Sequence, residues 1–293
     1  MVAGIIATFV NLVLNYILIF GHLGAPAMGV RGAALATVIS RYVEMIIVIT
    51  WTHTHTAQNP FAKGLFRTLR IPGKLLGAIV TKGMPLLLNE LMWTVGMALV
   101  NQCYSTCGLD VVPAMSISST IYNLAAVVFR SLGNTVGIFM GQMLGARRPK
   151  EELLDTNRKM TALAAFSGVF FGAIVACLSG AFPMLYNTTD AVRHLASNTI
   201  LVAAVLMPLQ AYSFPVYFTL RAGGKTVMTT LFDCGSIWFL YLPISFLLSR
   251  VTNLPFLAIF AICNSTDLIK CIVGTFLVRS GTWIQHLTGP EKE

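Results

Sequence analysis

The first twenty residues of this 293-residue chain carry no charged side chain, and seven further stretches of similar length and apolar character follow them. The hydrocarbon core of a bilayer is about 30 Å thick, and an α-helix needs roughly 20 apolar residues to cross it. Soluble domains rarely contain apolar runs of this length. The pattern therefore predicts an all-α, polytopic membrane protein with about eight transmembrane helices.

The predicted spans account for most of the chain. They lie at residues 2–20, 32–52, 77–101, 113–140, 160–182, 195–219, 227–249 and 255–278. The composition agrees, because 56% of the residues are hydrophobic, 11% are charged and the mean hydropathy is +0.75. A soluble enzyme of this length would need more polar surface. The opening run lacks a basic leading region and a small-residue cleavage site, so we predict a spanning helix and not a removable signal peptide.

The basic residues are distributed unevenly between the two sides of this predicted topology. An even number of spans places both termini on one side, which carries Lys63, Arg67, Arg70, Lys74, Lys82, Arg147, Arg148, Lys150, Arg158, Lys159, Arg221, Lys225, Arg279 and Lys292. The opposite loops hold only Arg31, Arg193 and Arg250. Because basic loops stay in the cytoplasm, both termini are predicted to be cytoplasmic. The net charge of +9 is thus a topology signal, and no nucleic-acid partner is expected.

The longest polar interruption, residues 53–75, divides the chain unequally. It contains Asn59-Pro60 and a basic, partly amphipathic segment at residues 61–70, which we expect to lie along the inner membrane surface. Two predicted helices precede this linker in residues 1–52, and six follow it in residues 76–293. Such an asymmetric division is unusual for a transporter, because these folds are commonly built from matched repeats.

Several ordered motifs resemble those of one known family. They are Asn15-Tyr16, Gly24-Ala-Pro26-Ala-Met-Gly29, Gly32-Ala-Ala-Leu-Ala-Thr37, Gly141-Gln142-Met-Leu-Gly145 and Leu220-Arg221-Ala-Gly223-Gly224, followed by Asp233, Trp238 and Pro243. In this order they resemble the fifth to twelfth helices of the multidrug and toxic compound extrusion (MATE) family. The resemblance covers nearly the whole chain, which makes it more specific than any single motif.

The resemblance implies a two-lobe helical bundle with the first four helices missing. Residues 1–52 would be a remnant of the first lobe, residues 53–75 a cytoplasmic linker, and residues 76–293 the second six-helix lobe with a short cytoplasmic tail. Either the gene product is truncated, or the start is a late one, or another chain completes the first lobe. The bilayer is an expected partner in each case. Because bacterial members of the family carry these motifs, the resemblance implies a plasma membrane, specifically a bacterial inner membrane, as the location.

The implied function is secondary active antiport. It would export cationic or amphipathic drugs and toxic organic compounds in exchange for protons or sodium ions, with no other cofactor. The alternatives are a MATE-like fragment without independent transport activity and an uncharacterised membrane channel. An enzyme is not expected, because no nucleophile–base pair or metal cluster is evident, and no GxxxxGK[ST] pattern supplies ATP hydrolysis.

Small residues also predict how some of the helices pack. Gly29, Gly32 and Ala36, with the alanines between them, give the second predicted helix a surface on which a neighbouring backbone can approach closely. Gly223-Gly224 permits a tight reversal between helices, with Arg221 anchoring that turn on the cytoplasmic side.

Glu90 is the leading candidate for a functional charge. An ionisable group at membrane depth costs at least about 2.5 to 3.5 kcal/mol, so it needs a partner, a water-filled cavity or a function. Trp93, Met97, Asn101 and Tyr104 follow Glu90 at helical spacing and share its face. A carboxylate beside aromatic rings and an adaptable methionine suits a hydrophobic organic cation. The alternative is that Glu90 is protonated or paired with a neighbouring helix.

The resemblance adds a coupling role for Glu90. Gly83-Met-Pro85 followed by Glu90 looks like the start of the family's seventh helix, whose acidic residue contributes to cation coupling in sodium-dependent members. This implies Glu90 as a possible sodium ligand. The position of the second carboxylate of such a site holds Gln210, which brings no charge.

Other charges in the predicted helices complete the candidate set. Asp267 precedes Lys270 by one turn, which predicts an ion pair within the helix. Asp233 has no cation within a turn and is the second candidate, and Arg130 is placed to pair with Glu90 or Asp233. Arg41 and Glu44 are expected to form a structural pair. The candidate cation-coupling or substrate-binding residues are Glu90, Trp93, Asn101, Tyr104, Asn123, Arg130, Gln210, Asp233 and Asp267.

Cysteine and histidine give no metal signal. Cys103 and Cys107 lie one turn apart without two further ligands nearby, and the other four cysteines are scattered as small apolar fillers. His53 and His55 are predicted to be a solvated loop pair.

Overall fold

The computed structural model describes residues 2–57, 59, 73–224 and 226–284. Within these residues the regular structure is helical, without a strand. Eight of the described helical segments are long and apolar enough to cross a membrane, which confirms the predicted all-α, polytopic class. Contacts divide the chain into two units, residues 1–77 and 78–293, which are described separately.

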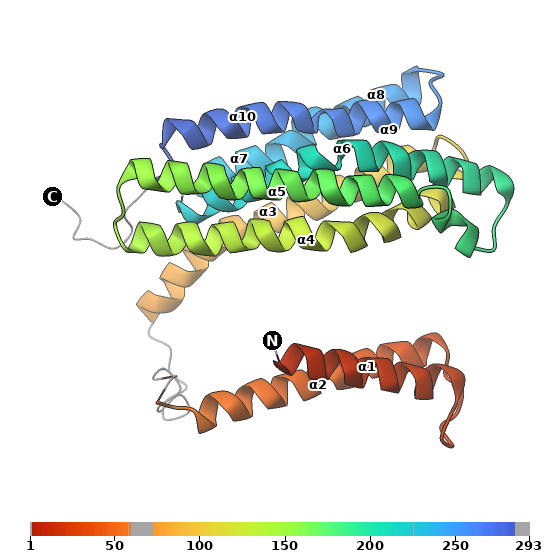
Figure 1. The fold of residues 1–293 in the computed structure, drawn as a ribbon, viewed down its shortest axis with the longest axis horizontal. Coiled ribbons are helices and arrows are strands. Elements are labelled where there is room, and N and C mark those ends of the chain that lie inside the picture. Colours follow the sequence, from red (N-terminus) through yellow and green to blue (C-terminus); the bar gives the residue numbers. More distant parts are fainter. Residues whose placement is uncertain (1, 58, 60–72, 225, 285–293) are drawn as a thin grey trace. The chain divides into compact units, whose positions relative to one another are not determined.

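The first unit is a pair of antiparallel helices. α1 (Val2–Phe20) and α2 (Val30–Thr54) lie side by side, as Figure 1 shows. Gly32 of α2 faces the backbone of α1, where a Cβ atom on it would meet the Leu18 carbonyl oxygen at 2.5 Å. Ala36, one turn further, is completely buried. The small residues of α2 therefore allow the close helix approach that the sequence predicts.

Three details of the first unit test the sequence expectations. Arg41 Nη1 lies 2.7 Å from Glu44 Oε2, which confirms that ion pair. Gly29 has a φ of 53° and makes no close contact, so it serves the turn into α2 and not the packing surface. His53 lies in the last turn of α2, because the helix extends beyond the apolar run, so its assignment to a loop was wrong. The predicted surface segment at residues 61–70 lies outside the described residues.

The second unit is a bundle of long helices, three of which form its centre. Its elements are α3 (Gly73–Ser105, beginning at the end of the first unit), α4 (Val111–Gly145), α5 (Lys150–Leu178), the short 3₁₀ helix η2 (Phe182–Leu185), α6 (Asp190–Ala222), α7 (Thr226–Ser236), the π-helical segment η3 (Ile237–Tyr241), α8 (Leu242–Val251), α9 (Phe256–Ser265) and α10 (Asp267–Ser280). α4, α5 and α6 run side by side in Figure 1. Buried side chains of α4 and α6 dominate the core between them.

One helix boundary differs substantially from its prediction. α5 begins at Lys150, ten residues before the predicted span, so Arg158 and Lys159 lie on a helix and not in a loop. Glu151 and Glu152 occupy its first turn, where carboxylates are stabilised by the positive end of the helix dipole. An apolarity criterion misses such a polar helical extension, because it detects only the part of the helix that suits lipid.

Glycine determines how closely α5 approaches α6. A Cβ atom on Gly168 would lie 2.4 Å from the Ala211 Cβ atom, and one on Gly172 would lie 2.7 Å from the Ala204 carbonyl oxygen. Both distances are shorter than van der Waals contact, so a larger residue at either position forces the helices apart.

Gly168→Ala is expected to destabilise the bundle by about 1 to 3 kcal/mol, the usual cost of inserting a methyl group into a close-packed interface. Gly141→Ala is the matched control, because a Cβ atom on Gly141 of α4 would meet no atom within 4 Å. Thermal unfolding of the two purified variants tests this. An equal unfolding temperature for both would contradict the packing described above.

Two of the spans are interrupted at mid-length. α7, η3 and α8 form one continuous span that contains the π-helical segment at residues 237–241, and the span formed by α9 and α10 breaks at Thr266. Such departures from regular α-helix are frequent at functional sites. Both interruptions lie beside the cavity described next, since Ile237, Tyr241 and Thr266 line it.

Candidate functional site

A cavity of about 620 Å³ lies within the second unit, between α3, α4, α6, α7, η3, α9 and α10. All nine candidate residues of the sequence analysis line it: Glu90, Trp93, Asn101, Tyr104, Asn123, Arg130, Gln210, Asp233 and Asp267. The structure thus brings these residues together around one space. Their roles in binding or coupling stay predictions.

The α3 face of the cavity follows directly from helical spacing. Trp93, Met97, Asn101 and Tyr104 recur every three or four residues and all line the cavity. Tyr104 is buried, and its hydroxyl donates to the Tyr241 hydroxyl at 3.3 Å. This contact joins α3 to the π-helical segment.

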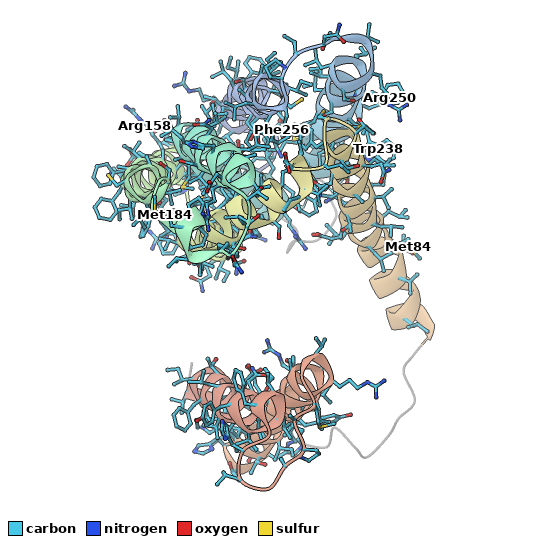
Figure 2. The ribbon with its side chains drawn as sticks, turned by 90° about the vertical axis from the view of Figure 1, so that its right-hand side faces the viewer. Met84, Arg158, Met184, Trp238, Arg250 and Phe256 are labelled. Carbon is cyan, nitrogen blue, oxygen red and sulfur yellow. The ribbon has the colours of Figure 1, made fainter. Side chains whose placement is uncertain are left out.

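A second contact holds the same two segments together nearer the middle of α3. Trp238, labelled in Figure 2, lies against α3, where its indole Nε1 donates to the Met92 carbonyl oxygen at 3.1 Å. Gly96 permits this approach, because a Cβ atom on it would lie 2.5 Å from Ile237 Cγ2. The α3 wall of the cavity is therefore fixed by side chains of η3.

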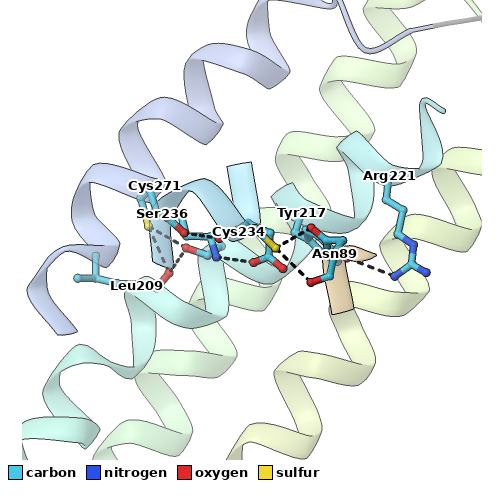
Figure 3. Close-up of polar contacts among 10 residues, drawn as sticks. Asn89, Leu209, Tyr217, Arg221, Cys234, Ser236 and Cys271 are labelled. Atoms are coloured by element: carbon cyan, nitrogen blue, oxygen red, sulfur yellow. Dashed lines mark hydrogen bonds and ion pairs between the residues drawn. The ribbon is translucent and has the colours of Figure 1, made fainter. Parts of the chain in front are cut away.

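Glu90 forms an ion pair that the sequence analysis left open. Its Oε1 lies 3.4 Å from Nη1 of Arg221, which Figure 3 shows at the end of α6. The Glu90 and Arg221 side chains are 61% and 37% exposed, so this pair contributes only about 0 to 1 kcal/mol. Arg221 was predicted to anchor a turn, and the structure shows that it also forms an ion pair with Glu90. Glu90 is thus a weakly held carboxylate at the cavity wall.

Arg130 does not make either of its predicted ion pairs in the described part of the chain. Its guanidinium lies over the Phe214 ring, 5.7 Å from the centroid. It also interacts with the Tyr122 side chain. Glu90 pairs instead with Arg221 of α6, and Asp233 pairs with Lys270 of α10.

The pairing predicted for Lys270 was wrong. Lys270 Nζ lies 2.9 Å from Asp233 Oδ1 on α7, whereas no ion pair joins it to Asp267 among the described residues. The Asp233 and Lys270 side chains are 14% and 15% exposed. Burial makes a hydrogen-bonded counter-ion obligatory, and the packing of α10 against α7 supplies one across the helices. Local i,i+3 spacing does not detect such a partner.

Tyr122, Gln210 and Asp267 form a short chain of polar contacts. The Tyr122 hydroxyl donates to Gln210 Oε1, and the Gln210 side chain interacts with the Asp267 carboxyl group. Gln210 therefore uses both its acceptor and its donor groups within the cavity wall. The sequence analysis did not select Tyr122, although it lies beside Asn123 on the polar side of the fourth predicted span.

Two cysteines directly follow the paired residues Asp233 and Lys270 in the sequence. Cys234 Sγ lies 3.1 Å from both the carbonyl oxygen and Oδ1 of Asn89, and Cys271 Sγ lies 3.2 Å from the Leu209 carbonyl oxygen, as Figure 3 shows. All six cysteines are free thiols, and no group of three or more His, Cys, Asp or Glu residues within the described ranges could hold a metal. Of the four predicted fillers only Cys177 is exposed.

The lining combines balanced charge with aromatic rings. Its carboxylates are Glu90, Asp233 and Asp267, and its cations are Arg130, Arg221 and Lys270. Aromatic and aliphatic side chains from α3, α6 and η3 separate these charges. Concave sites of this size, mostly apolar with a few convergent polar groups, are typical of small-molecule binding. Ionisable side chains around a cavity between apolar helices are typical of substrate and ion pathways in membrane proteins.

The chain belongs to the MATE family. Residues 85–247, more than half of its length, match the sequence model of the family described as MatE. This membership confirms the resemblance, and members of the MATE family are membrane transporters and not enzymes.

Named relatives are bacterial. The chain is 23% identical over 259 residues to the probable multidrug resistance protein YoeA of Bacillus subtilis (strain 168), covering 87% of this chain and 55% of YoeA. It is 26% identical over 289 residues to the probable multidrug resistance protein NorM of Mannheimia succiniciproducens, covering 97% of this chain and 57% of that NorM. The chain thus spans about half the length of these curated relatives.

Solved structures agree on the fold. The chain is similar to a crystal structure of MATE in complex with MaL6, with a TM-score of 0.81 and 17% identity over 96% of this chain and 62% of that one. It is also similar to the outward-facing conformation of a multidrug resistance MATE family transporter of the MOP superfamily, with a TM-score of 0.77 and 19% identity over 95% and 62%.

Proposed function

We propose that the protein is a secondary active antiporter that exports cationic or amphipathic organic compounds in exchange for protons or sodium ions. The observation that carries this proposal is the convergence of three carboxylates, Glu90, Asp233 and Asp267, with aromatic side chains around one cavity of about 620 Å³. Carboxylates attract a cation, and aromatic faces add cation–π contact. The names of two relatives, both probable multidrug resistance proteins, support the proposed export of organic compounds.

Exchange follows if the organic cation and the coupling ion do not occupy the cavity at the same time. Glu90 is the most available carboxylate, because its pair with Arg221 is long and exposed. A proton or a sodium ion would occupy it when the organic cation is absent, and would be released when the cation binds. A one-for-one exchange of monovalent cations moves no net charge, so the concentration gradient of the coupling ion drives it, at about 1.4 kcal/mol for each tenfold difference.

Sodium and proton make different demands on the site. Sodium is a hard cation that prefers several oxygen ligands. Glu90 supplies carboxylate oxygens, whereas Gln210 Oε1, which accepts the Tyr122 hydroxyl, brings an oxygen without a second negative charge. A sodium site would draw its remaining oxygens from other residues or water. A proton needs only the carboxylate. Both ions remain candidates for coupling.

The proposal includes the membrane orientation. With both termini in the cytoplasm, as in the prediction from basic residues, the turn between α6 and α7 with Arg221 lies at the cytoplasmic end of the bundle. The proposed location is a bacterial inner membrane.

The test is transport by the purified protein in liposomes loaded with dansylcadaverine, a fluorescent primary amine. An imposed inward proton gradient or sodium gradient should accelerate release of the probe, and an equal potassium gradient should not. Protein-free liposomes measure passive leak. Release that responds to neither gradient, from protein shown to be folded, would overturn the proposal.

A further inference from the structure

The Lys270 side chain is held as a bound ammonium ligand would be. Its Nζ lies 2.9 Å from Asp233 Oδ1 and 5.3 Å from the centroid of the Phe232 ring. A carboxylate acceptor combined with an aromatic face is a general solution for binding an ammonium group. Asp233 and Lys270 both line the cavity, so this contact lies at the wall of the candidate binding site.

The binding groups and the occupant come from different helices. Asp233 and Phe232 are neighbours on α7, whereas Lys270 comes from the first turn of α10, just after the break at Thr266. Removing the Lys270 ammonium would therefore leave the Asp233 carboxylate and the Phe232 ring in place, free to bind another ammonium group.

We propose that Asp233 and Phe232 form an ammonium-binding subsite that Lys270 fills in this structure, and that organic amines carrying N–H groups displace it. This inference rests on the proposed function for its place in transport. It assigns a substrate class, protonated primary, secondary and tertiary amines, in preference to quaternary cations. Lys270 then competes with the ligand for the subsite, so an amine binds only if it interacts with Asp233 and Phe232 more favourably than the Lys270 ammonium does.

The short Asp233 contact is the reason for preferring N–H amines. A distance of 2.9 Å is a charge-assisted hydrogen bond, and the displacing ligand must replace it to compensate the buried carboxylate. A quaternary nitrogen has no N–H, and its alkyl groups keep the charge further from the oxygen. It would leave Asp233 without a donor.

The displaced Lys270 ammonium also has a second carboxylate within reach. Asp267 lies three residues earlier on α10, a spacing at which side chains of one helix face meet, and it has no ion pair within 4.0 Å among the described residues. Lys270 thus pairs with Asp233 when the subsite is empty of ligand and with Asp267 when an amine binds. Exchange between these two carboxylates avoids an unpaired buried ammonium.

Chemical rescue tests the subsite directly. Lys270→Ala removes a group equivalent to n-propylammonium, so added n-propylammonium should bind the variant at least about tenfold more tightly than the wild type. Thermal unfolding of the purified proteins with increasing ligand reports the affinity. n-Propanol, which has no charge, and tetramethylammonium, which has no N–H, should not stabilise the variant. Lys159→Ala is the matched control, because its pair with Asp155 is exposed and lies outside the cavity.

A second measurement needs no variant. Wild-type protein should bind dansylcadaverine at least about tenfold more tightly than its trimethylammonium analogue. Equal affinity for these two probes, or an equal response of Lys270→Ala and Lys159→Ala to n-propylammonium, overturns the inference while leaving organic-cation export intact. Failure of the wild type to bind either probe would instead contradict the proposed function, and the inference with it.

Discussion

Glu90→Ala is expected to abolish gradient-driven release of dansylcadaverine while the protein still folds and inserts. Glu90 is 61% exposed at the cavity wall and weakly paired, so it is the carboxylate that an exchanging ion can reach. Its removal takes away the carboxylate that holds the coupling ion, so an ion gradient can no longer drive release. Because the pair with Arg221 contributes only about 0 to 1 kcal/mol, the unfolding temperature should change little. Transport in liposomes and thermal unfolding, measured on the same preparation, separate these effects.

Glu44→Ala is the matched control for this experiment. Glu44 is also a helix carboxylate paired with an arginine, at 2.7 Å from Arg41, but it does not line the cavity. This variant should keep wild-type transport. Unchanged transport by Glu90→Ala would exclude Glu90 as the coupling residue.

Trp283→Ala is expected to have the largest effect on stability, about 3 to 5 kcal/mol, the usual cost of truncating a buried tryptophan. Trp283 is 0% exposed although it follows the last helix, and its Nε1 donates to the Val278 carbonyl oxygen at 3.0 Å. Its backbone also covers the α6–α7 turn, where a Cβ atom on Gly223 would lie 2.1 Å from the Trp283 carbonyl oxygen. The side chain thus closes one end of the core formed by α4, α5, α6, α7 and α10. Thermal unfolding measures the loss.

The comparison for that variant is Trp51→Ala. Trp51 is 50% exposed on α2, so its truncation removes less packing. If the two variants unfold at the same temperature, Trp283 does not stabilise the bundle in the way described here.

Helical periodicity was sufficient to predict one wall of the site. Apolar length defined the spans, and the regular spacing of Trp93, Asn101 and Tyr104 after Glu90 placed these side chains on one face of α3. Both inferences depend only on the geometry of a single helix, which is a local property of the sequence.

Charge pairing between helices was not predictable in the same way. Lys270 was assigned to Asp267 by the i,i+3 rule, but the structure pairs it with Asp233 on α7. The preference of a buried ammonium depends on which carboxylate lies across the helix interface, and no spacing within one helix contains that information. The Glu90–Arg221 contact has the same origin, since it joins α3 to the end of α6.

The buried position of Trp283 was missed for a related reason. It lies beyond the last apolar run, in a segment that the sequence analysis treated as a short tail. Gly223 was interpreted as a turn residue, and only the structure shows that its missing side chain makes room for the backbone of Trp283. Long-range packing of this kind leaves no periodic signal in the sequence.

The most direct test of cation exchange at this cavity is equilibrium binding of dansylcadaverine to the purified protein at varied proton and sodium concentrations. We expect that raising one of these two ions weakens dansylcadaverine binding competitively, that potassium does not, and that Glu90→Gln removes the dependence on the competing ion. Dansylcadaverine binding that is equally tight at all proton and sodium concentrations would contradict exchange by competition at the cavity.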